Sequence, residues 1–141
     1  MFQETVPLAA WRNRAFVETY TLIGEDGEPL DLTDLTIRME VRQYGAQPGA
    51  ALISLGEVSS DIEGIWIYDP ETEAADPTKG RICIIIEIST LAAMPGGPTN
   101  GTEPNAPDTF VYDVVVTGAM PFTPLAFGGS FTLWPGVTEP A

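Results

Sequence analysis

The side chains best suited to chemistry in this sequence are the acids of a single loop, residues 69–79. Four carboxylates fall there: Asp69, Glu71, Glu73 and Asp76. Carboxylate oxygens are the ligands that calcium prefers, so the loop is a weak calcium candidate. Its spacing matches no EF-hand, and Pro70 and Pro77 stiffen the chain between the acids. We therefore expect a solvated acidic loop without a bound metal, and keep calcium as the less favoured alternative.

The other residue types point away from catalysis. The chain has no histidine and one cysteine, Cys83, so it lacks the base of a Ser-His-Asp or Cys-His arrangement and the ligands of a zinc cluster. It has neither a phosphate-binding glycine loop nor a dinucleotide fingerprint. A glycosidase would need two carboxyl groups held across a cleft, whereas most acids here lie in turns. We predict a protein that is not an enzyme and has no cofactor.

Aromatic side chains are the remaining candidates for binding. Our predicted partner contacts are Phe2, Trp11, Trp66 and Tyr68. Trp66 and Tyr68 alternate within one expected strand and so share a face. Core or edge packing is the favoured interpretation of these aromatics, and a face that binds a carbohydrate or another protein is the alternative. Trp11 follows an extended arm that has little reason to be ordered alone and that could lie against a neighbouring subunit.

The net charge of the chain limits the classes of partner that it can bind. Twenty acidic and six basic residues give a net charge of −14, and no Lys or Arg cluster is present to bind a phosphate backbone or an anionic membrane. We expect neutral or basic protein surfaces as partners. No segment approaches the roughly 20 apolar residues of a membrane helix. The first residues lack the features of a signal peptide, which predicts a soluble compartment.

The elements that must position these residues are strands. Fourteen glycines and 13 prolines separate short apolar runs, as in all-β proteins. Residues 36–44 alternate polar and apolar side chains, and the isoleucine-rich 81–88 segment predicts a central strand buried on both faces. Seven strands are expected, at residues 14–23, 36–44, 51–55, 64–68, 81–88, 110–117 and 127–134.

Seven short strands in 141 residues predict one domain, an antiparallel two-sheet sandwich. A closed β-barrel is the alternative fold. We place the domain at residues 14–138, between an extended N-terminal arm at 1–13 and a C-terminal tail at 139–141.

Several segments of the sequence, taken in order along the chain, form a recognisable pattern. Residues 11–16 lead into a strand that ends in the Gly-Glu-Asp-Gly turn at 24–27. Residues 29–42 join an Asp-Leu-Thr stretch to a strand of alternating charges, and residues 110–116 and 128–138 close the chain. This order resembles small tail-associated or baseplate-associated proteins of tailed bacteriophages and prophages. It also resembles the N-terminal attachment modules of some upper baseplate proteins.

The resemblance covers residues 11–138, and the chain departs from it through the insert at 95–107 and the long loop at 69–79. It implies an immunoglobulin-like or related β-sandwich without catalytic residues. It also implies a virion structural protein, assembled in the host bacterial cytoplasm, that contacts other virion proteins as multiple copies in a symmetric assembly. Because the chain stops after its last strand, we expect a tail, baseplate or fibre-attachment adaptor. The alternatives are a capsid decoration protein and a carbohydrate-binding host-contact module built on Trp66 and Tyr68.

Overall fold

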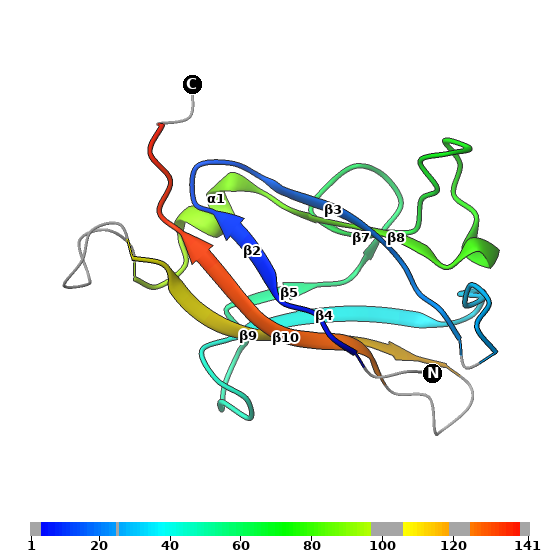
Figure 1. Ribbon diagram of the computed structural model, residues 1–141, viewed down its shortest axis with the longest axis horizontal. Coiled ribbons are helices and arrows are strands. Elements are labelled where there is room, and N and C mark those ends of the chain that lie inside the picture. The colour runs from blue at the N-terminus through cyan, green and yellow to red at the C-terminus, as the bar shows by residue number, and fades with distance from the viewer. Residues whose placement is uncertain (1–3, 25, 97–105, 119–124, 139–141) are drawn as a thin grey trace.

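The chain folds into two mixed β-sheets that lie one above the other (Figure 1). The computed structural model describes residues 4–24, 26–96, 106–118 and 125–138. The described strands of the first sheet are β1 (Glu4–Thr5), β2 (Leu8–Trp11), β4 (Thr36–Arg42), β5 (Ile53–Leu55), β9 (Asp108–Thr117) and β10 (Leu125–Trp134). Their order is β1-β10-β9-β4-β5, and β2 pairs with β10 on the same side as β1.

The second sheet has the order β3-β8-β7-β6. Its described strands are β3 (Phe16–Thr21), β6 (Glu57–Val58), β7 (Gly64–Trp66) and β8 (Arg81–Ile86). A 3-10 helix at Pro77–Lys79 precedes β8, and α1 (Ile88–Ala92) follows it. No helix in the described part of the chain is long and apolar enough to cross a membrane. The seven strands predicted from the sequence are all present in these two sheets, with bounds that differ by a few residues.

Side-chain alternation determines which face of each strand enters the core. In β4, Ile37, Met39 and Val41 are fully buried, while the intervening side chains face outward. Aromatic rings join the two sheets: the ring centroids of Phe16 and Phe131 lie 6.1 Å apart. Such burial between facing sheets is the main source of stability in a β protein of this size.

The isoleucine-rich strand lies where its sequence predicts. β8 pairs with β3 on one side and with β7 on the other. Ile82, Ile84 and Ile86 face the first sheet and are fully buried, and Cys83 and Ile85 are buried on the opposite face. The expectation of a central strand covered on both faces is confirmed.

The N-terminal arm differs from the prediction. We expected residues 1–13 to lie outside the domain, but β1 and β2 pair with β10 in parallel. Leu8 and Ala10 alternate toward the core and are buried, so this segment gains apolar contacts as well as a hydrogen-bonded edge. Phe2 and the tail at 139–141 lie outside the described residues, as does most of the 95–107 insert.

Two further expectations need correction. The sheets are not purely antiparallel, because β1 and β2 run parallel to β10 and β6 runs parallel to β7. The described strands also form two separate sheets with free edges, and not one closed sheet as in a barrel. Period-two patterning reports which residues face the core, but it does not report strand direction, so neither feature was readable from the sequence.

Candidate functional site

The structure does not bring the predicted contact aromatics into one patch. Trp11 ends β2 in the first sheet and is half-buried, and the guanidinium carbon of Arg14 lies 4.2 Å from the centroid of its ring. Trp66 belongs to β7 in the second sheet, beside Tyr68. Because Trp11 and Trp66 lie on different sheets, one ligand surface does not unite them. Phe2 is outside the described residues.

Trp66 and Tyr68 stack on each other instead of lying side by side. Their ring centroids are 3.9 Å apart, with 14° between the ring planes, and both side chains are half-buried. This stacked arrangement is an aromatic contact in its own right. It also leaves at most one face of each ring for a ligand, which weakens the case for a carbohydrate platform.

The acidic loop is tied to its own chain. Arg81 lies 3.6 Å from Oδ1 of Asp69 and 3.2 Å from Oε1 of Glu71. The buried Asp69 also accepts a hydrogen bond from the backbone N–H of Glu71. Asp76 accepts hydrogen bonds from the N–H and the hydroxyl of Thr78, and these hydrogen bonds lower the pKa of its carboxyl group.

The four acids therefore do not converge on one point. Asp69 and Ala74 form a bridge that closes a tight turn, with the exposed Glu73 in the left-handed region at φ 54°. Among the described residues, no three acidic, cysteine or histidine side chains gather in a group that could hold a metal ion. The carboxylates of the loop accept hydrogen bonds within local turns and form ion pairs with Arg81. The sequence pattern did not reveal these contacts.

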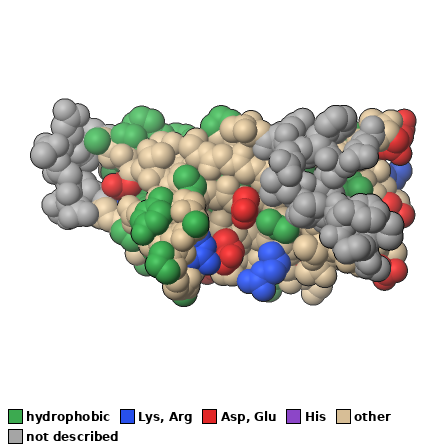
Figure 2. All heavy atoms as spheres, turned by 90° about the horizontal axis from the view of Figure 1, so that it is seen from below, with side chains coloured by type: hydrophobic (Ala, Val, Ile, Leu, Met, Phe, Trp, Pro, Cys, Tyr) green, Lys and Arg blue, Asp and Glu red, His purple; other side chains and the backbone are tan. Residues whose placement is uncertain are grey.

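A shallow groove runs along the outer face of the first sheet, between β4 and β9. Figure 2 views this face, where basic and acidic side chains lie together near the middle and apolar side chains gather to one side. The groove consists of two adjoining hollows of about 240 and 270 Å³. We call it the β4–β9 groove, lined by Arg38, Glu40, Arg42, Gly45, Ala46, Val111, Tyr112, Asp113, Val115 and Thr117.

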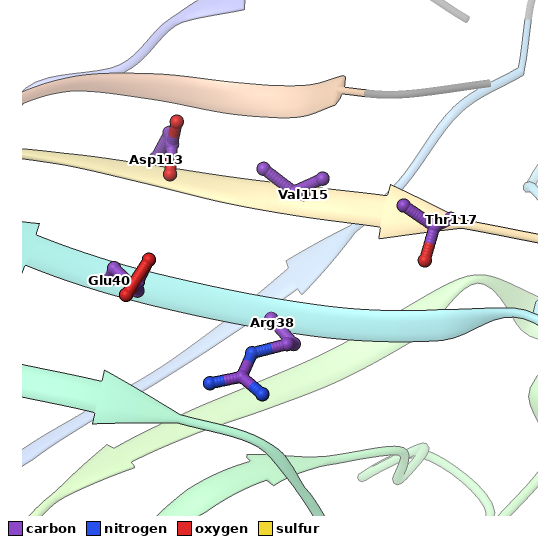
Figure 3. Close-up of a pocket in the computed structure, with 5 residues that line it drawn as sticks. All are labelled: Arg38, Glu40, Asp113, Val115 and Thr117. Carbon is purple, nitrogen blue, oxygen red and sulfur yellow. The ribbon is translucent and has the colours of Figure 1, made fainter. Parts of the chain in front are cut away.

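Two carboxylates face each other across this groove (Figure 3). Glu40 on β4 and Asp113 on β9 are directly opposite in the antiparallel ladder. Like charges in this position destabilise a sheet. Burial and the nearby Glu40 raise the pKa of the Asp113 carboxyl group, and Arg42 partly offsets them.

Neither arginine of the groove forms an ion pair with Asp113. Arg42 lies 3.3 Å from Oε2 of Glu40, and Arg38 extends away from β9 to donate a hydrogen bond of 2.8 Å to Ser54 on β5 (Figure 3). Asp113 forms no ion pair with any described arginine or lysine. The Asp113 side chain is exposed on this outer face.

Sequence reasoning placed the groove's residues on the outer face but did not single them out. The alternation of Arg38, Glu40 and Arg42 indicated a polar surface, which we interpreted as solvated. Asp113 likewise faced outward in the expected 110–117 strand. The register between the two strands, which sets Asp113 opposite Glu40, depends on pairing across more than 70 residues and had no signal in the sequence.

Replacing Asp113 with asparagine should stabilise the protein at pH 7 by about 0.5 kcal/mol, because it removes a like-charge pair at a partly exposed site. The raised pKa of Asp113 means that its ionisation opposes folding, so this gain should be complete above that pKa. The gain should vanish near pH 3, at which both folded and unfolded chains hold the proton, and should shrink in high salt. Urea unfolding at the two pH values measures it; an equal gain at both would contradict the electrostatic explanation.

The groove combines apolar and charged side chains on a broad, open surface. Glu40 and Asp113 could exchange protons, but no nucleophile with a base lies among its lining residues. Val111, which lines the groove, is 37% exposed. Such a mixture suits the side chains of another protein better than a small reacting molecule.

Comparisons with known proteins add no relative. A scan against protein-family models finds no match to this chain, and a search of curated proteins finds no significant similarity.

Proposed function

We propose that this chain is a non-enzymatic structural protein of a tailed bacteriophage particle. It serves as a tail, baseplate or fibre-attachment adaptor and is held by contacts with other virion proteins, in multiple copies. The phage assignment rests on the resemblance of residues 11–138. The observation that carries the docking role is the outer face of the first sheet, where the Asp113 carboxylate, which forms no ion pair with a described arginine or lysine, and the exposed Val111 line one groove.

We further propose that the fold is an immunoglobulin-like sandwich, and the strand order supports it. Immunoglobulin domains place strands B, E and D in one sheet and C, F and G in the other. Strands B, E and D correspond to β3, β8 and β7 in this chain. Strands C, F and G correspond to β4, β9 and β10. β5 extends the second set beside β4, as an additional strand does in variable-type domains.

The charge of the chain favours a basic partner. With a net charge of −14, the protein attracts cationic surfaces and repels acidic ones. The Asp113 carboxylate offers such a partner a specific contact, since a lysine or arginine bound there would also relieve its repulsion with Glu40. Val111 and Val115, which line the groove, would supply apolar contact area.

The direct test is a cryo-EM reconstruction of whole particles from the source, with this chain traced. Density at the tail, its collar or the baseplate, with the β4–β9 groove covered by another subunit, is the expected result. Density on the head shell would replace the adaptor with a decoration protein. Absence of the chain from the particle would contradict both structural roles.

A charge reversal tests the docking face separately. Asp113→Lys sets a lysine opposite Glu40, a favourable pair that offsets its repulsion with the nearby Arg42. The same lysine repels a basic partner. We expect the variant to fold normally and its occupancy in particles to fall about 10-fold, because like-charge contacts in interfaces are strongly unfavourable. The matched control is Asp61→Lys, which makes the same charge change at an exposed position outside the groove. Equal occupancy of both variants would argue against the groove.

A further inference from the structure

The second sheet ends in a strand with an open edge. β3 pairs with β8 on one side, and no described strand lies on its other side. Its six residues pair with β8 in continuous register, without a bulge or a proline. Open edges of this kind are templates for another strand, and proteins usually protect them with prolines, bulges or charges.

The hydrogen bonds beside β3 show which of its backbone groups are free. The N–H of Leu22, just past the strand, donates to the carbonyl of Gly80 at 2.8 Å and so points toward the β8 side. Because successive residues in a strand point their backbone groups to opposite sides, Val17, Thr19 and Thr21 direct theirs away from β8. No described group hydrogen-bonds to these outward N–H and carbonyl groups.

Two side chains define what can pair with this edge. Val17 is 58% exposed on the outer face of the sheet, opposite the buried Ile85. Glu18 shares the inward side with Phe16 and Tyr20, yet it is exposed and forms no ion pair with any described arginine or lysine. Glu18 is the kind of inward charge that discourages indiscriminate edge pairing.

The negative charge of Glu18 determines which kind of strand can pair with the edge of β3. An uncharged strand would leave the Glu18 carboxylate partly desolvated without a partner, which is unfavourable. A second copy of this chain would bring another net charge of −14, so self-pairing is opposed by repulsion. A strand with a lysine or arginine facing Glu18 would instead gain a cross-strand ion pair.

We propose that the free edge of β3 accepts an extended basic segment of another virion subunit, which adds a fifth strand to the second sheet. The segment hydrogen-bonds to the backbone of Val17, Thr19 and Thr21, pairs a lysine or arginine with Glu18, and covers Val17 with an apolar side chain. This is β-strand addition, in which the backbone supplies affinity and alternate side chains supply specificity. The inference rests on the proposed function, because it takes its partner from the particle.

Amide hydrogen exchange in the wild-type chain tests the edge without a mutation. In the isolated protein, the amides of Val17, Thr19 and Thr21 should exchange much faster than those of Glu18 and Tyr20, which are bonded to β8. In intact particles the three outward amides should slow at least about 10-fold. Slow exchange already present in the concentrated isolated protein would indicate self-pairing and overturn the proposed occupant.

The failures of the two proposals are distinguishable. A chain found in the particle with all three outward amides still exchanging rapidly would overturn the β3 inference alone. A chain absent from the particle would overturn the proposed function, and this inference with it.

A pair of variants at Thr19 tests the contribution of its outward backbone N–H group. Thr19→Pro removes this donor while leaving the hydrogen bonds to β8, and proline is tolerated at such edge positions. Thr19→Val keeps the N–H and loses the same hydroxyl group, so it is the matched control. We expect Thr19→Pro to lower occupancy in particles about 10-fold and Thr19→Val to leave it unchanged. Equal occupancy would overturn the proposal, and thermal unfolding of both isolated variants verifies that each folds.

The charge is tested at Glu18. Glu18→Lys should lower occupancy more than Glu18→Gln, because only the lysine repels a basic strand. Equal occupancy of the two variants at the wild-type level would contradict a basic segment at this edge.

Discussion

Replacing Arg12 with methionine is expected to lower the free energy of unfolding by about 3 kcal/mol, since it removes the cation of a largely buried, multiply hydrogen-bonded pair. Arg12 is 9% exposed. Its Nη1 donates to the carbonyl oxygen of Met94 at 2.7 Å, and its Nη2 donates to that of Pro95 at 2.7 Å and to Oδ2 of Asp108 at 2.9 Å. One side chain thus links the N-terminal strand, the segment after α1 and the start of β9.

The methionine variant is chosen because it preserves most of the apolar stem of arginine while removing the guanidinium group. The carbonyl groups beyond α1 would then lack their donor, and unsatisfied buried polar groups are costly. The free energy of unfolding of Arg12→Lys should lie between those of the wild type and Arg12→Met. Lysine retains the charge but cannot bind several acceptors in the fork geometry of arginine.

The matched control for Arg12 is the same substitution two residues along the chain. Arg14 is exposed and contacts the ring of Trp11, so Arg14→Met should cost no more than about 1 kcal/mol. Urea unfolding followed by tryptophan fluorescence measures both variants. Similar losses for Arg12→Met and Arg14→Met would show that the buried hydrogen bonds of Arg12 contribute little net stability.

Phe131→Ala is expected to lower the free energy of unfolding by about 4 kcal/mol, within the usual range for truncating a buried aromatic side chain. Phe131 is fully buried on β10. Its ring centroid lies 6.1 Å from that of Phe16 in the second sheet and 6.5 Å from that of Tyr112 in the adjacent β9. The truncation therefore opens a cavity where the two sheets meet, and rigid strands on both sides limit its collapse.

Two further variants calibrate the Phe131 result. Phe131→Leu retains much of the apolar volume and should lose about 1.5 kcal/mol. Val17→Ala, at a side chain that is 58% exposed, should change stability by less than about 0.5 kcal/mol. The same urea unfolding compares all three variants. A loss below 2 kcal/mol for Phe131→Ala would mean that the core relaxes around the missing ring, contrary to our expectation.

The fold was predictable where local pattern carries the information. The alternation in residues 36–44 correctly placed Ile37, Met39 and Val41 in the core, and the isoleucine run correctly placed β8 at the centre of its sheet. The N-terminal strand was missed because β2 is only four residues long and gains its stability from pairing with β10, more than 100 residues away. Short strands without a local partner have little signal of their own.

The candidate site was less predictable than the fold. The predicted residues Trp66 and Tyr68 share one side of the chain, but the structure stacks their rings instead of presenting them as an open platform. The acids of the 69–79 loop are close in sequence, yet Arg81 and backbone N–H groups occupy several of their oxygens. The groove and the β3 edge arise from sheet assembly, and the sequence drew attention to neither.

Composition and side-chain alternation are local properties of the chain, and they were enough to show that the protein is acidic, nearly all-β and without histidine chemistry. Which strands are neighbours, and in which direction they run, became known from the folded chain. This arrangement sets Glu40 against Asp113, buries Arg12 beside Asp108 and leaves β3 with a free edge. Strand pairing is settled by burial and hydrogen bonding between distant segments, and many pairings satisfy the same alternating pattern.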